Sequence, residues 1–224
     1  MNRTTLALFA AIATLVVAPL AADAAKPPKS PGKLTLAATP NPVKYGRSVT
    51  LAGKLSGPNN GGKVVNIFAD PYPFSDVGFT NVTSATTNAS GDYSTTQKPT
   101  VNTRYYARQA GEQSAVVTVL VRPAVSLKLS DYTPKRAQRV RFSGRVCPQH
   151  DGRSLSIQRR YSTGYKTIRK TTLSDIPGSN CSSYRKTFRI YRDGRFRAVI
   201  VGSTPSHRDH ATGRSRSRVA DVHN

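Results

Sequence analysis

Few residues in this 224-residue sequence could carry acid–base, nucleophilic or metal chemistry. Glu112 is the only glutamate, and the only histidines are His150, His207, His210 and His223. The segment HRDH places His207 and His210 three residues apart with Asp209 between them, a spacing that suggests a metal site. All four histidines fall in predicted loops or in the C-terminal tail, where no helix aligns them. We therefore expect solvent-exposed histidines, no metal site and no cofactor.

Nucleophilic catalysis has no better support in the sequence. A GxSxG nucleophile elbow is absent, although serines are plentiful. The segment GGK at 61–63 lacks the longer glycine-rich spacing and the following helix of a phosphate loop, and it indicates a turn before a strand. We therefore predict that the protein is not an enzyme and that no residue is catalytic.

The N-terminus has the layout of a secretory signal peptide over residues 1–24. Arg3 is followed by the apolar run LALFAAIATLVVAPL, and the small residues ADA precede a cleavage point between Ala24 and Ala25. The apolar run is about 15 residues long, whereas a membrane-spanning helix needs about 20. We expect a secreted, extracellular protein with no membrane span after cleavage, associated with the cell wall if it binds a wall polymer.

Cys147 and Cys181 are the only two cysteines. In an oxidising compartment an even pair indicates one disulfide, with a reactive thiol pair as the alternative. A structural metal site would need more ligands of the right kind nearby. The prediction is one disulfide between Cys147 and Cys181.

The formal net charge is +23, and it is concentrated in the second part of the chain. Residues 1–123 contain 12 Lys and Arg against 5 Asp and Glu, and residues 124–224 contain 22 against 6. Such a surface attracts anions of any kind, including nucleic acid, acidic polysaccharide, cell-wall polymers and lipid headgroups. Charge alone does not choose among these partners.

An internal repeat organises the chain. The segment SVTLAGKL at 48–55 matches RVRFSGRV at 139–146, and DYSTTQKP at 92–99 matches SYRKTFRI at 183–190, each pair 91 residues apart. The offset grows to 103 at the end, because the second copy contains the longer loop GSTPSHRDHATGR. The predicted organisation is a signal peptide at 1–24, a Pro-rich basic leader at 25–32, and one domain each at 33–123 and 124–224.

Each copy is predicted to be all-β, because short segments alternate polar with apolar residues between turn residues. In the first copy we expect strands at residues 34–38, 48–55, 63–69, 79–86, 93–97, 104–109 and 115–121. Seven strands in under 100 residues indicate an immunoglobulin-like β-sandwich. The predicted fold is therefore two tandem immunoglobulin-like β-sandwich domains.

The chain over residues 34–224 resembles the tandem immunoglobulin-like repeats of proteins secreted by actinobacteria. The resemblance rests on VTLAGKL, GGKVVNIF, ASGDYSTT and TRYYAR in the first copy, and on VRFSGRVCPQHDGRSLSIQRR, NCSSYRKTFRIYRDGRFRAVIVG and HATGRSRSR in the second. It implies surface stalks, adhesion or substrate-presenting modules, and no catalytic residues. The first copy lacks both cysteines, so the two copies need not share a partner.

The sandwich also makes predictions for the cysteines and the arginines. The second and fifth strands are antiparallel neighbours in this fold, which would bring the ends at Cys147 and Cys181 together. Alternation along the same strands puts four arginines on one outer surface, with Lys186 at the rim, and puts two more on the opposite sheet. These six are the candidate polyanion-binding residues: Arg141, Arg145, Arg185, Arg189, Arg195 and Arg197.

Two functions remain open at this point. The first is a secreted, non-enzymatic structural spacer or surface-interaction protein. The alternative is a polyanion-binding module for cell-wall polymer, acidic polysaccharide or extracellular DNA. The expected partners are an anionic cell-envelope polymer or another surface protein, with no specific nucleic acid, because two basic patches facing apart do not form one nucleic-acid groove.

Overall fold

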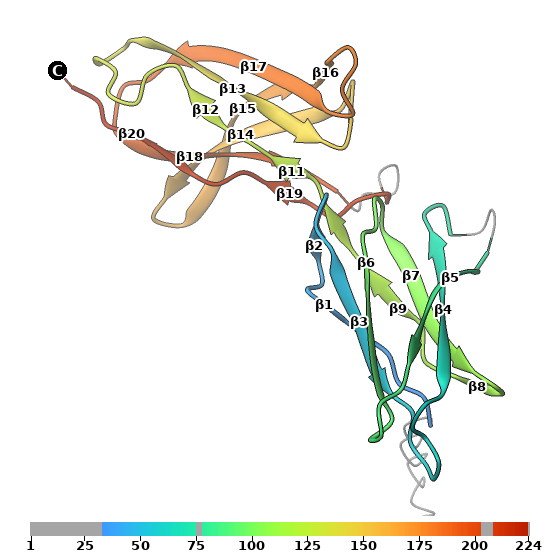
Figure 1. Ribbon diagram of the computed structural model, residues 1–224. Coiled ribbons are helices and arrows are strands. Elements are labelled where there is room, and N and C mark those ends of the chain that lie inside the picture. Colours follow the sequence, from blue (N-terminus) through green and yellow to red (C-terminus); the bar gives the residue numbers. More distant parts are fainter. Residues whose placement is uncertain (1–32, 75–77, 203–207, 224) are drawn as a thin grey trace, which may run out of the picture. The chain divides into compact units, whose positions relative to one another are not determined.

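The computed structural model describes residues 33–74, 78–202 and 208–223 (Figure 1). The predicted signal peptide at 1–24 and the basic leader at 25–32 lie outside the described residues. The part of the chain that is described contains twenty strands and no helix, and thus no helix that is long and apolar enough to cross a bilayer. Residues Pro31–Asn224 form one compact unit.

Residues 33–122 build two antiparallel sheets and one short parallel pair. The first sheet has the order β1 (Ala37–Thr39), β3 (Val49–Lys54) and β6 (Asp92–Gln97). The second has the order β5 (Thr80–Thr86), β4 (Val64–Pro71), β7 (Thr103–Gln109) and β8 (Glu112–Gln113), and β9 (Val117–Val119) also pairs with β7. The parallel pair is β2 (Val43–Lys44) with β10 (Val121–Arg122).

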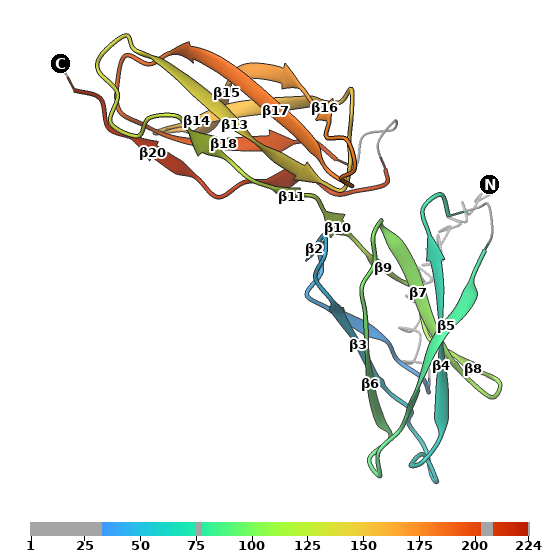
Figure 2. The same cartoon turned by 45° about the horizontal axis from the view of Figure 1, so that its top comes forward.

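Residues 124–220 also build two antiparallel sheets. One sheet has the order β11 (Ala124–Val125), β13 (Arg139–Cys147), β17 (Ser182–Arg189) and β16 (Ser174–Asp175), and β12 (Lys128–Leu129) also pairs with β13. The other has the order β15 (Gly164–Thr172), β14 (Ser154–Tyr161), β18 (Gly194–Ile200) and β19 (Gly213–Arg214), with β20 (Arg218–Ala220) also on β18. Figure 2 shows β13 and β17 side by side.

Two separate hydrophobic clusters fill the spaces between these sheets. Alternation creates them: in β3, Val49 and Leu51 are fully buried while Thr50 between them is exposed. In the second cluster the Phe142 ring of β13 lies 5.1 Å from the Phe196 ring of β18 in an edge-to-face arrangement. The architecture is consistent with sandwich packing in each half of the chain.

One contact recurs in both halves at the offset of 91 that the repeat predicts. The Tyr184 hydroxyl donates to the Ser126 carbonyl at 2.6 Å, and the Tyr93 hydroxyl donates in the same way to the Thr35 carbonyl. Each tyrosine lies over a glycine directly opposite it in the neighbouring strand, Gly144 in the second half and Gly53 in the first. A side chain at either glycine would collide with that same carbonyl. Glycine is therefore what lets the tyrosine reach across the sheet.

A second contact recurs near the last strands. The Ser114 hydroxyl accepts from the Ala107 amide at 2.9 Å, and the Ser215 hydroxyl accepts from the Ala198 amide at 2.9 Å. Both serines are buried, so each hydroxyl satisfies an amide that water does not reach. The two halves thus share specific internal hydrogen bonds as well as strand order.

The predicted strands of the first half are present, with ends that differ by at most three residues. The antiparallel pairing of the second and fifth predicted strands is also present, as β3 with β6 and β13 with β17. The short strands β2 and β8 were not predicted, because two-residue pairings carry no alternation that a sequence pattern could reveal.

Candidate functional site

The predicted disulfide joins Cys147 to Cys181. Cys147 is the last residue of β13, and Cys181 immediately precedes β17. Antiparallel pairing of Val146 with Ser182 brings these two ends together, which leaves the Cα atoms 4.4 Å apart. The disulfide therefore closes the end of the β13–β17 pair at which Arg145 lies.

Five arginines lie on the outer face of the β13–β17 pair. Residues directly opposite each other on antiparallel strands share a face, and the register pairs Arg139 with Arg189 and Ser143 with Arg185. The core face of β13 holds Val140, Phe142 and Val146. The outer face carries four of the six predicted polyanion-binding residues together with one that was not predicted: Arg141, Arg145, Arg185 and Arg189, with Arg139.

The other two predicted residues, Arg195 and Arg197, lie on β18 in the opposite sheet. The Arg197 guanidinium lies 3.8 Å from the centroid of the Tyr165 ring, and its Nε donates to the Gln158 side chain at 2.8 Å. Burial lowers the pKa of Arg197, and the nearby charge of Arg214 lowers it further. Arg195 and Arg197 thus lie on a different sheet from the other four predicted residues.

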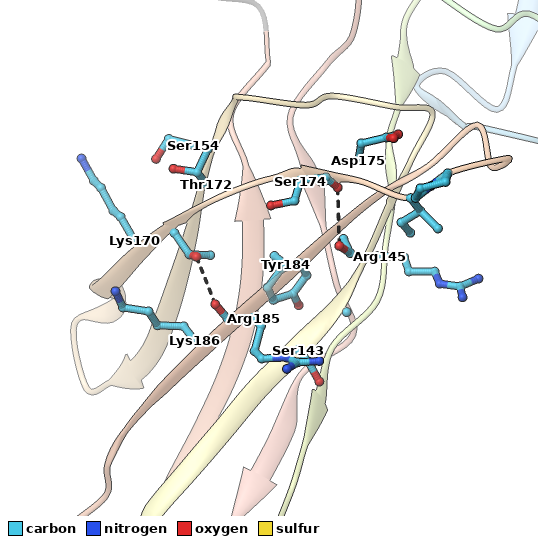
Figure 3. Close-up of a pocket in the computed structure, with 15 residues that line it drawn as sticks. Ser143, Arg145, Ser154, Lys170, Thr172, Ser174, Asp175, Tyr184, Arg185 and Lys186 are labelled. Atoms are coloured by element: carbon cyan, nitrogen blue, oxygen red, sulfur yellow. Dashed lines mark hydrogen bonds between the residues drawn. The ribbon is translucent and has the colours of Figure 1, made fainter.

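A polar groove of about 960 Å³ opens along one edge of the second half (Figure 3). Four cationic side chains line it: Arg145, Lys170, Arg185 and Lys186. Its other polar groups are mainly hydroxyls, among them Ser143, Ser154, Thr172 and Ser174. Figure 3 shows Lys170 and Lys186 on the same side of the groove.

Two sheets contribute to this groove. Lys170 comes from the end of β15, and the Thr171 hydroxyl beside it donates to the Arg185 carbonyl at 3.2 Å (Figure 3). This hydrogen bond joins β15 to β17 across the edge of the sandwich. Lys186 breaks the alternation of β17 and is exposed. Lys170 was not predicted, because it lies on a strand whose register the sequence does not reveal.

Among the described residues that line the groove, Asp175 provides the one carboxylate. Asp175 accepts a hydrogen bond from the Gln149 side chain at 3.0 Å. Within the described ranges none of the four cations lies within 4.0 Å of a carboxylate. All four are exposed. Their charges are therefore available to an anionic ligand.

The expectation of solvent-exposed histidines is wrong for two of the four. His150 and His210 are 5% and 3% exposed, and they lie on either side of Asp209. His223 is exposed as expected, and His207 lies outside the described residues. The reason is packing: the Asn102 amide donates to the Asp209 carbonyl at 2.8 Å, which holds the loop around residue 210 against another segment.

The groups of this cluster contact one another closely. His210 Nδ1 lies 2.7 Å from Asp209 Oδ2, and His150 Nε2 lies 3.8 Å from the same oxygen. Burial lowers the pKa of His150. Burial raises the pKa of Asp209, but the hydrogen bond with His210 and the charge of Arg153 outweigh it, so this pKa lies below its usual value. The sequence offers no spacing that would pair His150 with His210, which are 60 positions apart.

No protein family matches the chain, and no curated protein matches it. Among solved structures, the chain is similar to the tetra-tandem repeat in the extending region of a large adhesion protein, with a TM-score of 0.33 and 16% sequence identity. The similarity covers 86% of this chain and 49% of that chain, so this chain spans about half of its length. At this level the similarity carries no argument about function.

Proposed function

We propose that the protein is a secreted, non-enzymatic surface-interaction protein made of two immunoglobulin-like sandwiches, and that its second sandwich binds anionic polymers through the groove. Two hydrophobic clusters and the contacts that recur at an offset of 91 support the tandem arrangement. The Cys147–Cys181 disulfide supports an extracellular location, because disulfides persist in oxidising compartments.

The observation that carries the proposal is the unpaired charge of the groove. Arg145, Lys170, Arg185 and Lys186 surround a surface of hydroxyls, and the single carboxylate there is hydrogen-bonded to glutamine. Guanidinium and ammonium groups bind phosphate, sulfate and carboxylate through charge-assisted hydrogen bonds. Serine and threonine hydroxyls both donate and accept, which suits the hydroxyl groups of a polysaccharide.

A polymer fits this surface better than a small anion does. Arg145 and Arg185 belong both to the groove and to the outer arginine face. The cations therefore continue from the groove along β13 and β17, with successive outward residues about 7 Å apart. A chain that carries a charge at regular intervals can contact several of them at once, whereas one small ion cannot.

The competing function is a spacer whose arginines serve only solubility. Basic residues on two sheets, with Arg195 and Arg197 on the second, would also produce diffuse attraction to any polyanion. The two functions differ in where the binding energy lies: in the groove under our proposal, and evenly over the surface under the competing one.

The test compares two variants of equal net charge in the secreted chain that begins at Ala25. The groove variant carries Arg145→Gln, Lys170→Gln, Arg185→Gln and Lys186→Gln. The control removes four exposed arginines elsewhere: Arg160→Gln, Arg192→Gln, Arg195→Gln and Arg216→Gln. The affinity of each variant for heparin is measured by titration calorimetry between about 50 and 300 mM NaCl. Electrostatic contacts weaken steeply over roughly this range of salt concentration.

We expect the groove variant to lose most of its affinity and the control to retain most of it. The slope of log K against log salt should become shallower by roughly 3 in the groove variant, on the value of about 0.7 to 0.9 that each neutralised phosphate contributes in nucleic acids. Equal losses in both variants would show diffuse attraction and overturn the groove assignment. Absence of heparin binding by the unmodified chain at about 150 mM salt would overturn polyanion binding altogether.

A further inference from the structure

The cluster of His150, Asp209 and His210 brings three potential ligand atoms within 4.8 Å of one another. Its two imidazole rings are buried and lie 4.9 Å apart between centroids. The cluster lies apart from the groove, since none of its residues lines it. Its chemistry can be worked out from the hydrogen bonds that each ring nitrogen makes.

One ring nitrogen of His150 has a lone pair that is not used in a hydrogen bond. Its Nδ1 lies 2.7 Å from the Pro148 carbonyl, which can only accept, so Nδ1 carries the proton. The other nitrogen, Nε2, then has a free electron pair, is buried, and has no hydrogen-bond partner among the residues that the structure describes. It lies 3.8 Å from Asp209 Oδ2.

His210 repeats this arrangement from the other side. Its Nε2 lies 2.8 Å from the Thr100 carbonyl and must donate to it. Its Nδ1 lies 2.7 Å from Asp209 Oδ2. A neutral ring with its proton on Nε2 has only an electron pair at Nδ1, and a carboxylate oxygen also has only electron pairs. The contact therefore requires either a proton shared by the two atoms or a metal ion bound to both.

We propose that His150, Asp209 and His210 bind a divalent transition-metal ion of the zinc class through His150 Nε2, Asp209 Oδ2 and His210 Nδ1. Two imidazoles and one carboxylate, with a fourth position open to water, form a donor set that Zn²⁺ accepts. Both rings donate their remaining N–H to a backbone carbonyl, which is how metal-binding histidines are usually oriented. Ligand atoms of a tetrahedral zinc site lie about 3.3 Å apart. Here the two histidine nitrogens lie 2.7 Å and 3.8 Å from Asp209 Oδ2 and all three atoms lie within 4.8 Å of one another, so His150 must move closer when the ion binds.

The second carboxylate oxygen already has a partner. Arg153 Nη1 lies 3.4 Å from Asp209 Oδ1, which orients the carboxylate so that Oδ2 is directed at the histidines. The Asp209 side chain is 32% exposed, while those of both histidines are at most 3% exposed. Solvent therefore reaches the cluster from the aspartate side, where the open position would be.

The consequence of metal binding is structural. Asp209 and His210 belong to the loop that lengthens the second copy. This loop is held to residues 100–102 by His210 Nε2 on the Thr100 carbonyl and by Asn102 on the Asp209 and Arg208 carbonyls. A metal ion that joins the loop to His150 would fasten these segments together.

The test is metal titration of the secreted chain after removal of metal with EDTA. Zn²⁺ binding is followed by calorimetry, and Co²⁺ is used as a probe because its visible absorption reports tetrahedral nitrogen and oxygen ligands. We expect one equivalent to bind. Asp209→Asn, which keeps the shape of a half-exposed side chain, should abolish binding, and Arg153→Gln should weaken it by roughly 10- to 100-fold because it only orients the carboxylate. The control is His223→Gln, which removes an exposed histidine and should bind as the unmodified chain does.

The folding of each variant is checked by circular dichroism and thermal unfolding in EDTA. His150→Gln changes a buried side chain and can unfold the chain, so Asp209→Asn is the deciding variant. If the unmodified chain binds no stoichiometric Zn²⁺, the cluster is held by hydrogen bonds alone and the proposal is overturned. Unchanged binding in folded Asp209→Asn, or loss of the site in His223→Gln, would also overturn it.

Discussion

Replacement of Gly144 by alanine tests how closely the two strands that hold Tyr184 and Ser126 must approach each other. A Cβ at position 144 would lie 2.1 Å from the Ser126 carbonyl oxygen and 2.8 Å from Cε1 of Tyr184. Cβ atoms essentially never come within 3.0 Å of another group, and one of the two groups is backbone. The segment at Ser126 must therefore move away from β13.

That movement breaks two hydrogen bonds of Ser126. The Tyr184 hydroxyl loses the Ser126 carbonyl, and the Ser126 amide loses the Arg145 carbonyl at 2.9 Å. Overpacking alone costs about 1–3 kcal/mol, and an unsatisfied buried polar group costs about 1–3 kcal/mol. We expect Gly144→Ala to lower the free energy of unfolding by roughly 3–5 kcal/mol. Tyr184→Phe keeps the packing and loses only the hydrogen bond, so about 1–2 kcal/mol is expected.

The assay is urea unfolding followed by far-UV circular dichroism. Gly111→Ala is the matched control, because a Cβ there would meet nothing within 4 Å; its effect should stay within about 0.5 kcal/mol. Gly53→Ala should reproduce the loss in the first half, since its Cβ would lie 1.9 Å from the Thr35 carbonyl oxygen. Midpoints for Gly144→Ala and Gly53→Ala equal to that of Gly111→Ala would refute the reasoning.

Three further predictions concern other residues. Replacing Cys147 and Cys181 by serine opens a loop of 34 residues and should cost about 4 kcal/mol of unfolding free energy on the loop-entropy relation; an unchanged urea midpoint would contradict it. Burial raises the pKa of Tyr93 from 10.0 to about 12, so the stability that its neutral phenol contributes should be present below pH 10 and lost as pH rises through about 12. Ultraviolet titration should show this late ionisation, and Tyr93→Phe should remove it. Tyr165→Leu removes the ring beside Arg197 and should lower the unfolding free energy by about 0.5–1 kcal/mol, an effect that should vanish when Arg197 is already glutamine.

The fold could be predicted because its signals are local or periodic. Alternation locates β3, β13 and β17, and the repeat offset of 91 carries the assignment from one half to the other. The contact of Tyr184 with Ser126 could not be predicted, because it depends on a carbonyl 58 positions away. The parallel pairing of β2 with β10 could not be predicted either, because it joins the two ends of the first half.

Prediction of the candidate sites from the sequence has a different limit. Arg141 and Arg185 could be placed because alternation fixes their face once the strands are known. Lys170 enters the groove only through the packing of β15 against β17. His210 was expected in solvent because it lies in a loop, yet a loop whose backbone is hydrogen-bonded to another segment can bury its side chains. The alternation of polar and apolar residues predicts on which face of a strand a residue lies, but it does not predict where a long loop packs.

The two halves differ at the surface for which anion binding is proposed. The positions equivalent to Arg185 and Lys186 at the offset of 91 are Ser94 and Thr95, which carry no charge. The position equivalent to Arg145 is Lys54, whose ammonium lies 3.6 Å from Asp92.

The cysteines are likewise replaced in the first half, by Ser56 and Ser90. That end of the sheet is instead joined by a hydrogen bond from the Leu55 amide to the Gly91 carbonyl at 2.8 Å. What the halves share is therefore internal, as with the tyrosine over its glycine, and what they do not share lies at the disulfide, the groove and the histidine cluster. Residues that keep a sandwich folded are needed in both copies, whereas a binding surface is needed in only one. This asymmetry favours a specific role for the second half over a uniform spacer.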